Sequence, residues 1–458
     1  MEHPLKLDPP PVLHVEEVVE RIGFGRFQIQ LLFMIGLPLF ADCMEIFLIA
    51  FIALDVQREF QCSDLVLSFL TCIVFVGMFF GSIFFGMLSD YIGREVTFTT
   101  AITLTTVGGL LNAHSTNAPS FILTRGLCGL GIGGSHVGIT LFLEFLPTQS
   151  RSLYLSIIQF CGALGAVLEC CLAWALQNHS WRWLVRCTAI PAAISALCTL
   201  FLPQSPRYLL VRNRPTDAAK VYQQVAKQNG KEDTLPTDFE ISSVIKDGEQ
   251  FSLAHRLRGL HEDPQMRRLT WALCAVWFTV SFSYYGLVFL SATIRTSSRD
   301  ELHWTLLLIS LAEFPAYYLA HRIAGSKGRR NGMTAVALFG MLPMAVLGLQ
   351  DYFPSAVLLP TMFFARCAFA TLFALVVLYT PEAFPTAMRS TACGLTNAFS
   401  RIAGAVTPFV SFRLRAVSVM AAGGVYVGVL CMGMVATQML PFETNGRALR
   451  DVVGGSSR

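Results

Sequence analysis

One eight-residue pattern occurs twice in this chain and constrains its fold more than any other feature. Glu144-Phe-Leu-Pro147-Thr148-Gln-Ser-Arg151 and Glu382-Ala-Phe-Pro385-Thr386-Ala-Met-Arg389 share Glu, Pro, Thr and Arg at the same spacing, 238 residues apart. Two shorter pairs recur at nearly this offset: Gly93-Arg94 with Gly328-Arg329, and Leu202-Pro203 with Leu440-Pro441. The pattern predicts two related halves joined by a linker. In an apolar chain, such repetition is typical of transporters built from two homologous helical bundles.

Composition places most of the chain in a bilayer. Apolar residues make up 53% of it, charged residues 14%, and the mean hydropathy is +0.55. A soluble protein needs more charge to cover its surface, so lipid must be the solvent for much of the chain. The 13 cysteines show no ligand spacing, and we expect them to be core residues, with no metal or other cofactor. The polar N-terminal segment does not resemble a cleavable signal peptide.

Twelve apolar segments are long enough to cross a membrane as helices, which takes about 20 residues. They are 28–53, 64–88, 96–115, 120–143, 153–176, 183–202, 269–292, 303–323, 332–350, 355–380, 391–412 and 417–440. The expected fold is an all-α polytopic membrane protein with two pseudo-symmetric six-helix bundles, residues 27–202 and 268–440. Residues 203–267 are expected to form a linker with one or two short amphipathic helices, between terminal segments 1–26 and 441–458.

The distribution of positive charge predicts the orientation. With both termini and the linker in the cytosol, Lys and Arg are much more frequent in the cytosolic loops than in the loops on the other side, even when the linker is left out. We therefore expect an integral, multi-pass protein with both termini in the cytosol. The membrane would be the plasma membrane or that of an intracellular vesicle.

The loop between the second and third expected helices has the residues of a gate. Asp90 can sit at the positive end of a neighbouring helix, Arg94 can pair with Glu144, and the second half offers the equivalent pair of Arg329 and Glu382. Such pairs would close the cytosolic side in one state and part in the other. The alternative is that they only cap helices and fix the topology. The candidate gate residues are Gly86, Asp90, Gly93, Arg94, Glu144, Arg151, Arg329, Glu382 and Arg389.

Several of these motifs resemble those of the major facilitator superfamily. Gly86–Arg94 is similar to its hallmark loop, and the fourth-helix run Arg125–Arg151 and Pro203-Gln-Ser-Pro206-Arg207 resemble motifs of its sugar and organic-ion branch. Within that branch the chain resembles the synaptic vesicle 2-related proteins, on four further pieces: Ile22-Gly23-Phe-Gly25-Arg-Phe, Asp42-Cys-Met-Glu45, Tyr284-Tyr285-Gly286 and Glu443-Thr-Asn-Gly446. The resemblance runs from about residue 15 to 450 and implies the same twelve-helix fold, working by alternating access.

Departures from the family pattern qualify what the resemblance implies. Glu95 stands where the hallmark loop has a basic residue, and Gln204 replaces a Glu. Gly325 stands where the second-half loop has an Asp, which implies a weaker gate in that half. The paired glutamines that hexose transporters carry in the seventh helix are not apparent, which counts against a sugar as substrate.

Charges inside a membrane are expensive and are therefore functional candidates. The seven are Asp42, Glu45, Arg125, Glu169, Glu313, Arg366 and Arg401. Asp42 and Glu45 share a helix face, and an acid there opposite Arg125 resembles the coupling pair of proton-coupled sugar transporters. Arg125 would hold Asp42 ionised, and protonation would release it. The alternative is a structural ion pair that never titrates.

A small-molecule cavity is expected between the two bundles. Arg401 lies on a polar face with Asn397, and Trp277, Tyr284 and Tyr285 supply aromatic surface; Glu169, Glu313 and Arg366 complete the candidate set. An accessible arginine favours an organic anion or a zwitterion. For each aromatic side chain, plain helix packing is the alternative.

Other classes of function find no support in the sequence. Gly129–Gly134 lies within an apolar span, where glycine serves close helix contact, and not after a strand as a phosphate-binding loop requires. We see no nucleophile–base pair and no basic face for nucleic acid, so we do not expect an enzyme. The sequence predicts a monomeric transporter of a small organic solute, either proton-coupled or facilitative. The competing hypothesis is a protein of the same fold that no longer transports and acts as a binding partner in vesicle membranes.

Overall fold

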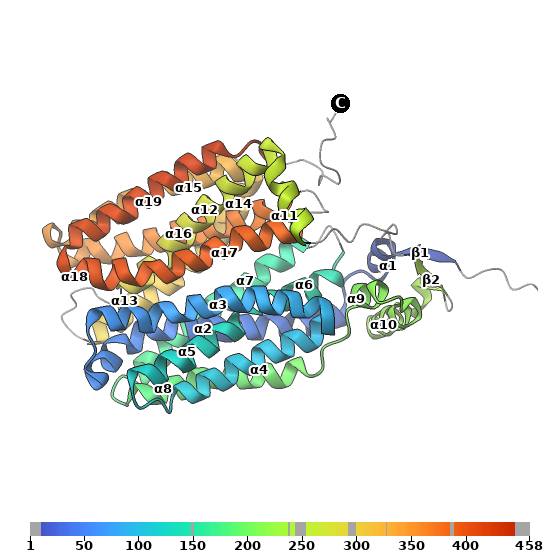
Figure 1. Cartoon of the computed structure of the whole chain (residues 1–458), viewed down its shortest axis with the longest axis horizontal. Helices are drawn as coiled ribbons and strands as arrows, with labels where there is room; N and C mark the ends of the chain where they lie inside the picture. Colours follow the sequence, from blue (N-terminus) through green and yellow to red (C-terminus); the bar gives the residue numbers. More distant parts are fainter. Residues whose placement is uncertain are drawn as a thin grey trace, which may run out of the picture.

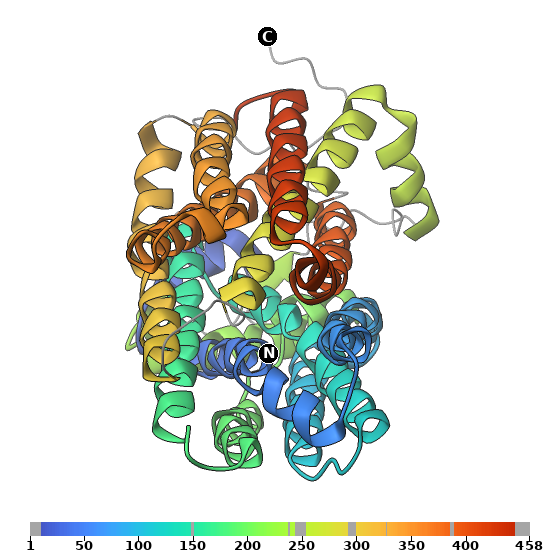
Figure 2. The ribbon, with the colours of Figure 1, turned by 90° about the vertical axis from the view of Figure 1, so that its left-hand side faces the viewer.

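The computed structural model describes residues 11–147, 151–236, 239–242, 253–291, 299–326, 328–384 and 389–444. Long helices run nearly side by side in two groups, one from each half of the chain (Figure 1). Seen along the helices, the blue-to-green first half lies below the yellow-to-red second half (Figure 2). Thr148, Pro385 and Thr386 of the repeated pattern lie outside the described residues.

The first bundle contains six membrane segments. They are α2 (Arg26–Phe60), α3 (Asp64–Ile92), α4 (Arg94–Asn112), α5 with α6 (Ala118–Gly133 and His136–Glu144), α7 (Arg151–Ala175) and α8 (Trp181–Thr199). Each lies at one of the six segments predicted for the first half.

The second bundle repeats this arrangement. It consists of α12 (Pro264–Ser291), α13 with α14 (Arg299–Leu311 and Glu313–Ser326), α15 (Arg329–Gly348), α16 (Ser355–Ala383), α17 (Arg389–Pro408) and α19 (Val419–Met439). A π-helical turn, η4 (Phe409–Leu414), and α18 (Arg415–Val417) connect α17 to α19, and η3 (Gln350–Tyr352) follows α15. The predicted twelve-segment, two-bundle fold is confirmed.

Eight of these segments are long and apolar enough to cross a membrane by length and composition alone. They are the helices or joined helices at Arg26–Phe60, Asp64–Ile92, Ala118–Glu144, Leu153–Ala175, Pro264–Ser291, Arg329–Gly348, Ala356–Ala383 and Val419–Met439. The remaining four segments are α4, α8, α13 with α14, and α17. They occupy the other positions of the two bundles and carry charged residues such as Glu313 and Arg401.

Three irregularities within the membrane segments have local causes. Pro315 lies in the first turn of α14, where its missing N–H and its ring prevent a continuous helix from α13. Pro408 precedes the π-helical turn η4 in the same way. Between α5 and α6 the chain reads Gly133-Gly134-Ser135, and glycine is the weakest helix former after proline. The sequence analysis predicted continuous helices at all three places.

Glycine allows α3 and α5 to pack backbone against backbone. A Cβ atom on Gly129 would lie 2.2 Å from the carbonyl oxygen of Val74, and one on Gly81 would lie 2.0 Å from that of Leu130. No side chain fits in this space, so the helices approach as closely as their backbones permit. The expectation that Gly129 serves close helix contact is confirmed, and Gly81 does the same without having been predicted.

Shorter elements gather at one end of the bundles, on the right in Figure 1, which we call the linker end. They are α1 (Val15–Ile22), α9 (Pro206–Val211), α10 (Pro215–Gln228), η2 (Glu232–Thr234) and α11 (Leu253–Glu262). Strand β1 (Val12–His14) pairs in parallel with β2 (Glu240–Ser242), with Leu13 opposite Ile241. One or two short helices were predicted in the linker, and the structure has three, α9, α10 and α11; α1 and the strand pair were not predicted.

Contacts between the bundles gather at the other end, called the opposite end, and at mid-height. At the opposite end the rings of Trp174 and Trp304 lie 4.8 Å apart, and Trp174 Nε1 donates to Asp300 Oδ1 at 2.9 Å. At mid-height the rings of Phe75 and Tyr285 lie 4.8 Å apart. The bundles therefore meet through aromatic rings and a few hydrogen bonds.

Candidate functional site

A buried ion pair ties α2 to α5 inside the first bundle. Arg125 Nη1 lies 2.8 Å from Glu45 Oε2, and Nη2 donates to the backbone carbonyl of Glu45 at 2.9 Å. Both side chains are about 1% exposed. Because the guanidinium binds both the carboxylate and the main chain of one residue, it fixes α2 against α5.

Asp42 has a different partner from the one the sequence predicted. Arg125 does not contact it; instead the hydroxyl of Ser135, in the break between α5 and α6, donates to its carboxylate. The reason is geometric, because Asp42 lies almost one helical turn from Glu45 and faces the break rather than Arg125. Arg401 of the second bundle interacts electrostatically with Asp42. The predicted pair of Asp42 and Arg125 is therefore corrected to Glu45 and Arg125.

Glu169 lies inside the first bundle and not at the bundle interface. It is fully buried, and the hydroxyl of Thr188 on α8 donates to its Oε2 at 2.9 Å. This position does not fit the predicted role of lining a substrate cavity. Burial among α2, α7 and α8 makes Glu169 a neighbour of the Glu45–Arg125 pair instead.

The second bundle contains its own buried pair, Glu313 of α14 and Arg366 of α16. Tyr284 OH donates to Glu313 Oε1 at 2.8 Å, and Tyr317 OH to Oε2 at 3.3 Å. The Arg366 guanidinium also stacks 3.7 Å from the centre of the Tyr284 ring and 5.1 Å from that of Phe47 in the first bundle. Glu313 and Arg366 thus form a closed network at the interface.

The two buried arginines are related by the internal repeat. Arg125 and Arg366 are 241 residues apart, close to the offset of the repeated pattern, and lie on equivalent helices. Each is paired with a glutamate of its own bundle. The sequence contained this signal, because both arginines were candidates, but their equivalence was not recognised.

The three predicted aromatic residues separate into two groups. Tyr284 and Tyr285 lie at the interface, where Tyr285 packs against Phe75 of the first bundle. Trp277 is 4% exposed and lies between α12 and α16, where Nε1 donates to the hydroxyl of Thr380 at 3.0 Å. Trp277 is therefore a packing residue of the second bundle, which corrects its assignment to the cavity.

The partly exposed polar side chains at the interface come from α17 and from the α5–α6 break. Arg401 and Asn397 are half-buried, and Arg401 Nη1 lies 3.9 Å from Met78 Sδ. His136, at the start of α6, is exposed and interacts electrostatically with Arg401. Sequence reasoning missed His136, although its place after Gly133-Gly134-Ser135 could have indicated it. Arg401, Asn397, His136 and Asp42 form the candidate solute site.

At the linker end, both predicted ion pairs are formed. Arg94 Nε lies 2.7 Å from Glu144 Oε1, and Arg329 Nη2 lies 3.0 Å from Glu382 Oε1. The hydroxyl of Ser205 also donates to Glu144. Each pair joins helices of a single bundle, so neither bridges the two bundles directly, and their role as a gate stays a prediction.

A carboxylate caps the helix that starts at each of these arginines. Glu443 accepts hydrogen bonds from the backbone N–H groups of Arg329 and Arg330 at 2.8 and 2.9 Å. At α4 the Glu95 carboxylate lies close to its own backbone N–H and to that of Ser205. Such caps satisfy free N–H groups at the positive end of a helix. Glu95, a departure from the family loop, thus has a structural role here.

The other gate candidates are placed as follows. Gly93 and Gly328 have φ of 99° and 80°, which favour glycine. A Cβ on Gly86 would lie 3.7 Å from His136 Nε2. Asp90 is exposed, and among the described residues no bond joins its carboxylate to a helix N-terminus. Arg151 Nε donates to the Leu146 carbonyl at 3.3 Å, while the Arg389 side chain lies outside the described residues.

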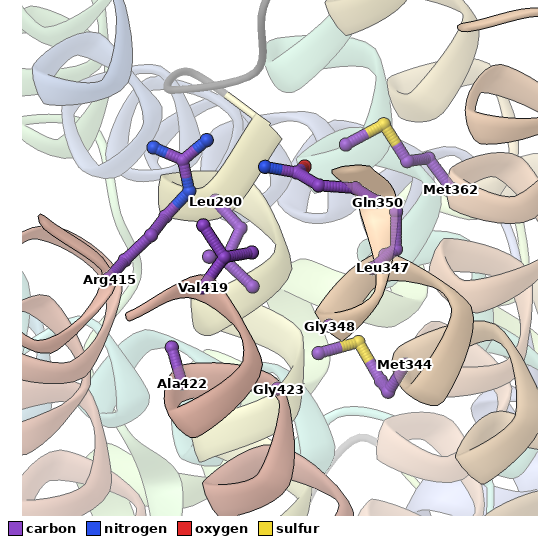
Figure 3. A pocket seen from close by; sticks show the side chains of 10 residues that line it. All are labelled: Leu290, Met344, Leu347, Gly348, Gln350, Met362, Arg415, Val419, Ala422 and Gly423. Atoms are coloured by element: carbon purple, nitrogen blue, oxygen red, sulfur yellow. The ribbon is translucent and has the colours of Figure 1, made fainter. Parts of the chain in front are cut away.

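A depression near the opposite end lies between α12, α15, α16 and α19 (Figure 3). Its lining includes Met344, Leu347 and Met362, with Gln350 and Arg415 at its rim. Its cavity volume is about 10 Å³, which is room for about one water molecule. It is therefore too small to hold an organic solute.

Comparison with known proteins agrees with this architecture. Residues 39–453 match the family described as "Sugar (and other) transporter". The chain is 32% identical to putative transporter svop-1 of Caenorhabditis elegans (95% of this chain, 86% of that protein) and 31% identical to synaptic vesicle 2-related protein of Rattus norvegicus (95% and 82%). It is 29% identical to organic cation/carnitine transporter 7 of Arabidopsis thaliana (96% and 97%).

Among solved structures, the fold is similar to that of the proton:xylose symporter XylE, a major facilitator superfamily protein. The TM-score is 0.70 at 20% identity, covering 92% of this chain and 97% of that one. The likeness shows the fold alone. Together with two helical bundles, paired intramembrane charges and the matched family model, it defines the class as integral membrane solute transporters. The chain belongs to the sugar (and other) transporter family, and its relatives include synaptic vesicle 2-related proteins, as the motifs indicated.

Proposed function

We propose that this transporter carries a small organic anion or zwitterion, and that Arg401 binds its carboxylate. The observation that carries the proposal is that Arg401 is half-buried at the bundle interface. Arg125 and Arg366 are committed to glutamates of their own bundles, whereas Arg401 makes a weak contact with the thioether of Met78 and interacts with the hydroxyl of Tyr285. A guanidinium in this setting suits a carboxylate, to which it can donate two parallel hydrogen bonds.

The relatives agree with a charged organic solute, since one is named an organic cation/carnitine transporter. Transport would proceed by alternating access, with the linker end on the cytosolic side and both termini in the cytosol. The contacts at the opposite end, the exposure of His136 and the partial exposure of Asn397 support a state that is open toward the linker end. The linker-end ion pairs would then hold each bundle rigid while the bundles rock. We further propose that the protein works as a monomer, in the plasma membrane or a vesicle membrane.

Uptake by the full chain in liposomes tests this function. Purified protein is reconstituted, and uptake of radiolabelled benzoate, phenylalanine and benzylamine is measured with and without an inward-directed proton gradient. We expect uptake of benzoate or phenylalanine, and its loss in Arg401→Ala. Arg186→Ala is the matched control, because Arg186 packs on the exposed Trp183 ring of α8. Uptake of benzylamine alone, or unchanged uptake in Arg401→Ala, would contradict the proposal. A protein that binds no solute would instead favour the non-transporting alternative.

A further inference from the structure

The linker ends of α2 and α12 are equivalent by the internal repeat but are covered differently. Arg26 at the start of α2 and Arg267 near the start of α12 are 241 residues apart, the offset that also relates the two buried arginines. At α2 the linker supplies the cover. Asn229, directly after α10, accepts a hydrogen bond from the backbone N–H of Phe27 at 2.9 Å and donates to the side chain of Gln28 at 2.9 Å.

The start of α12 instead presents two arginines and a tryptophan on one face. Arg267 and Arg268 precede Trp271 by four and three residues, so the three side chains lie on the same side of the helix. All three are exposed, Trp271 by 56%, whereas Leu269 between them is buried. Tryptophan is enriched at the headgroup level of a membrane, and arginine extends its guanidinium into the polar layer just beyond. The three residues have this order along α12.

This face of α12 lies on the outer side of the second bundle. The Trp271 ring packs edge to face on Phe399 of α17, with 6.1 Å between the ring centres. Phe399 is two residues from Arg401 and therefore lies on roughly the opposite side of α17, whereas Arg401 contacts Met78 of the first bundle. Helix α11, which packs beside α12 and α17, lies at the edge of the second bundle away from the first (Figures 1 and 2). Trp271 thus borders on lipid and not on the solute site.

The carboxylates next to this face in the sequence have other partners. Glu262 lies 3.9 Å from Arg258 Nε on α11, and Asp263 accepts a hydrogen bond from the backbone N–H of Gln265 at 3.0 Å. Neither of these two carboxylates forms an ion pair with the arginines of α12. Because Asp263 caps the helix, the positive charge left here belongs to two guanidinium groups and not to the helix end.

We propose that Arg267, Arg268 and Trp271 bind the headgroup of an anionic phospholipid in the cytosolic leaflet. The phosphate and the further acidic group of the headgroup accept hydrogen bonds from the guanidiniums, and the indole packs on the adjoining part of the lipid. In the first bundle, linker residues cover the equivalent place, so the repeat provides one such site and not two. This inference goes beyond the proposed function and takes from it only the placement of the linker end in the cytosol, where anionic lipids are enriched.

Thermal unfolding of the full chain in detergent with added lipid tests the proposal. Protein without solute is titrated with dioleoylphosphatidylserine or with dioleoylphosphatidylcholine, and the rise in melting temperature gives the affinity for each lipid. We expect stronger binding of phosphatidylserine. The double variant Arg267→Gln/Arg268→Gln should bind phosphatidylserine about 30-fold more weakly and phosphatidylcholine unchanged. Arg26→Gln is the matched control, because it removes an exposed arginine from the equivalent position of α2.

Each result bears on the proposal. Equal binding of the two lipids by the wild type, or a preference for phosphatidylserine that persists in the double variant, overturns it. An equal loss in Arg26→Gln also overturns it, because the effect would then be one of surface charge in general. Inorganic phosphate that stabilises the wild type as strongly as phosphatidylserine would assign the site to a free anion instead.

A second double variant separates lost charge from a damaged helix. Arg267→Lys/Arg268→Lys keeps both charges and should keep the preference for phosphatidylserine; a loss as large as in the glutamine variant would contradict the proposal. An unchanged melting temperature in phosphatidylcholine shows that each variant is folded. Solute uptake is measured separately, so its absence would leave this lipid site standing, and loss of the lipid site would leave the solute site standing.

Discussion

At the scale of single residues, the buried arginines differ from Arg401 in what surrounds them. Arg366 is fully buried and bound to Glu313, while Tyr284 and Tyr317 satisfy the remaining lone pairs of that carboxylate. Arg125 and Glu45 form a similar pair in the first bundle. Pairs of this kind are costly to break singly, since the remaining charge stays buried without a counter-ion. We therefore assign the two pairs a structural role and Arg401 a role in binding.

Replacement of Arg366 by Met should lower stability far more than replacement of Arg401 by Met. The expected cost in the free energy of unfolding is about 3–5 kcal/mol for Arg366→Met, because Glu313 loses its counter-ion in the buried interface. Arg401→Met should cost less, since its guanidinium is partly exposed. The measurement is equilibrium unfolding of both variants in the same detergent. Equal losses would show that Arg366 does not stabilise the bundle through Glu313.

At the scale of secondary-structure elements, the starts of α4 and α15 share one construction. A glycine with positive φ precedes each arginine, and a carboxylate occupies the place that a Cβ atom would take. A Cβ on Gly328 would lie 2.6 Å from the Glu443 carboxylate, and one on Gly93 would lie 3.1 Å from that of Glu95. At the start of α4, Arg94 then lies beside Glu144, and at the start of α15, Arg329 lies beside Glu382.

Gly328→Ala should therefore destabilise the second bundle, whereas Gly325→Ala should not. The φ of 80° and ψ of 166° at Gly328 are almost restricted to glycine, and forcing another residue into them costs about 1–3 kcal/mol. Nothing lies within 4 Å of a Cβ on Gly325, near the end of α14, where alanine favours the helix. Thermal unfolding of the two variants gives the comparison. A Gly328→Ala protein as stable as wild type would contradict this account of the cap.

At the scale of the whole molecule, the fold was predictable and the pairing of the membrane charges was not. Hydropathy and the repeat of Glu144 at Glu382 were enough to predict twelve segments in two bundles. The partner of Asp42 was not predictable, because Asp42 and Glu45 share a helix face and a three-residue spacing does not say which one faces Arg125. Trp277 and Tyr284 belong to one helix, and their separation depends on the packing of α12 against α16. The strand pair joins residues 228 apart, which no local pattern indicates.

The closed opposite end provides a prediction for the molecule as a whole. Asp300 accepts hydrogen bonds from Gln177 and Trp174 across the bundle interface, and these lower the pKa of its carboxyl below the ordinary value of 3.8. A carboxyl with a lowered pKa stabilises the closed end at pH above 3.8, and the stabilisation is lost as the pH falls through the lowered pKa. The closed end should therefore not weaken between pH 5 and 8 from this cause.

Asp300→Ala should open the opposite end more often at neutral pH. Hydrogen exchange measured by mass spectrometry should become faster in the peptides that contain the end of α7 and the start of α13. Asp351→Ala, at an exposed aspartate in η3, is the control and should leave exchange in those peptides unchanged. Unchanged exchange in Asp300→Ala would mean that the tryptophan contact alone keeps this end closed.

The contact between Trp174 and Trp304 at the opposite end has a consequence for the rate of the transport cycle. It consists of two indoles packed edge to face and of Asp300, which accepts a hydrogen bond from Trp174, so opening it leaves no buried charge without a partner. Contacts of this kind cost little free energy to break, whereas the buried ion pairs inside each bundle cost much more. The two bundles should therefore move relative to each other at their interface, each as a rigid unit. Binding of the solute, rather than disruption of either bundle, should limit the rate of the transport cycle.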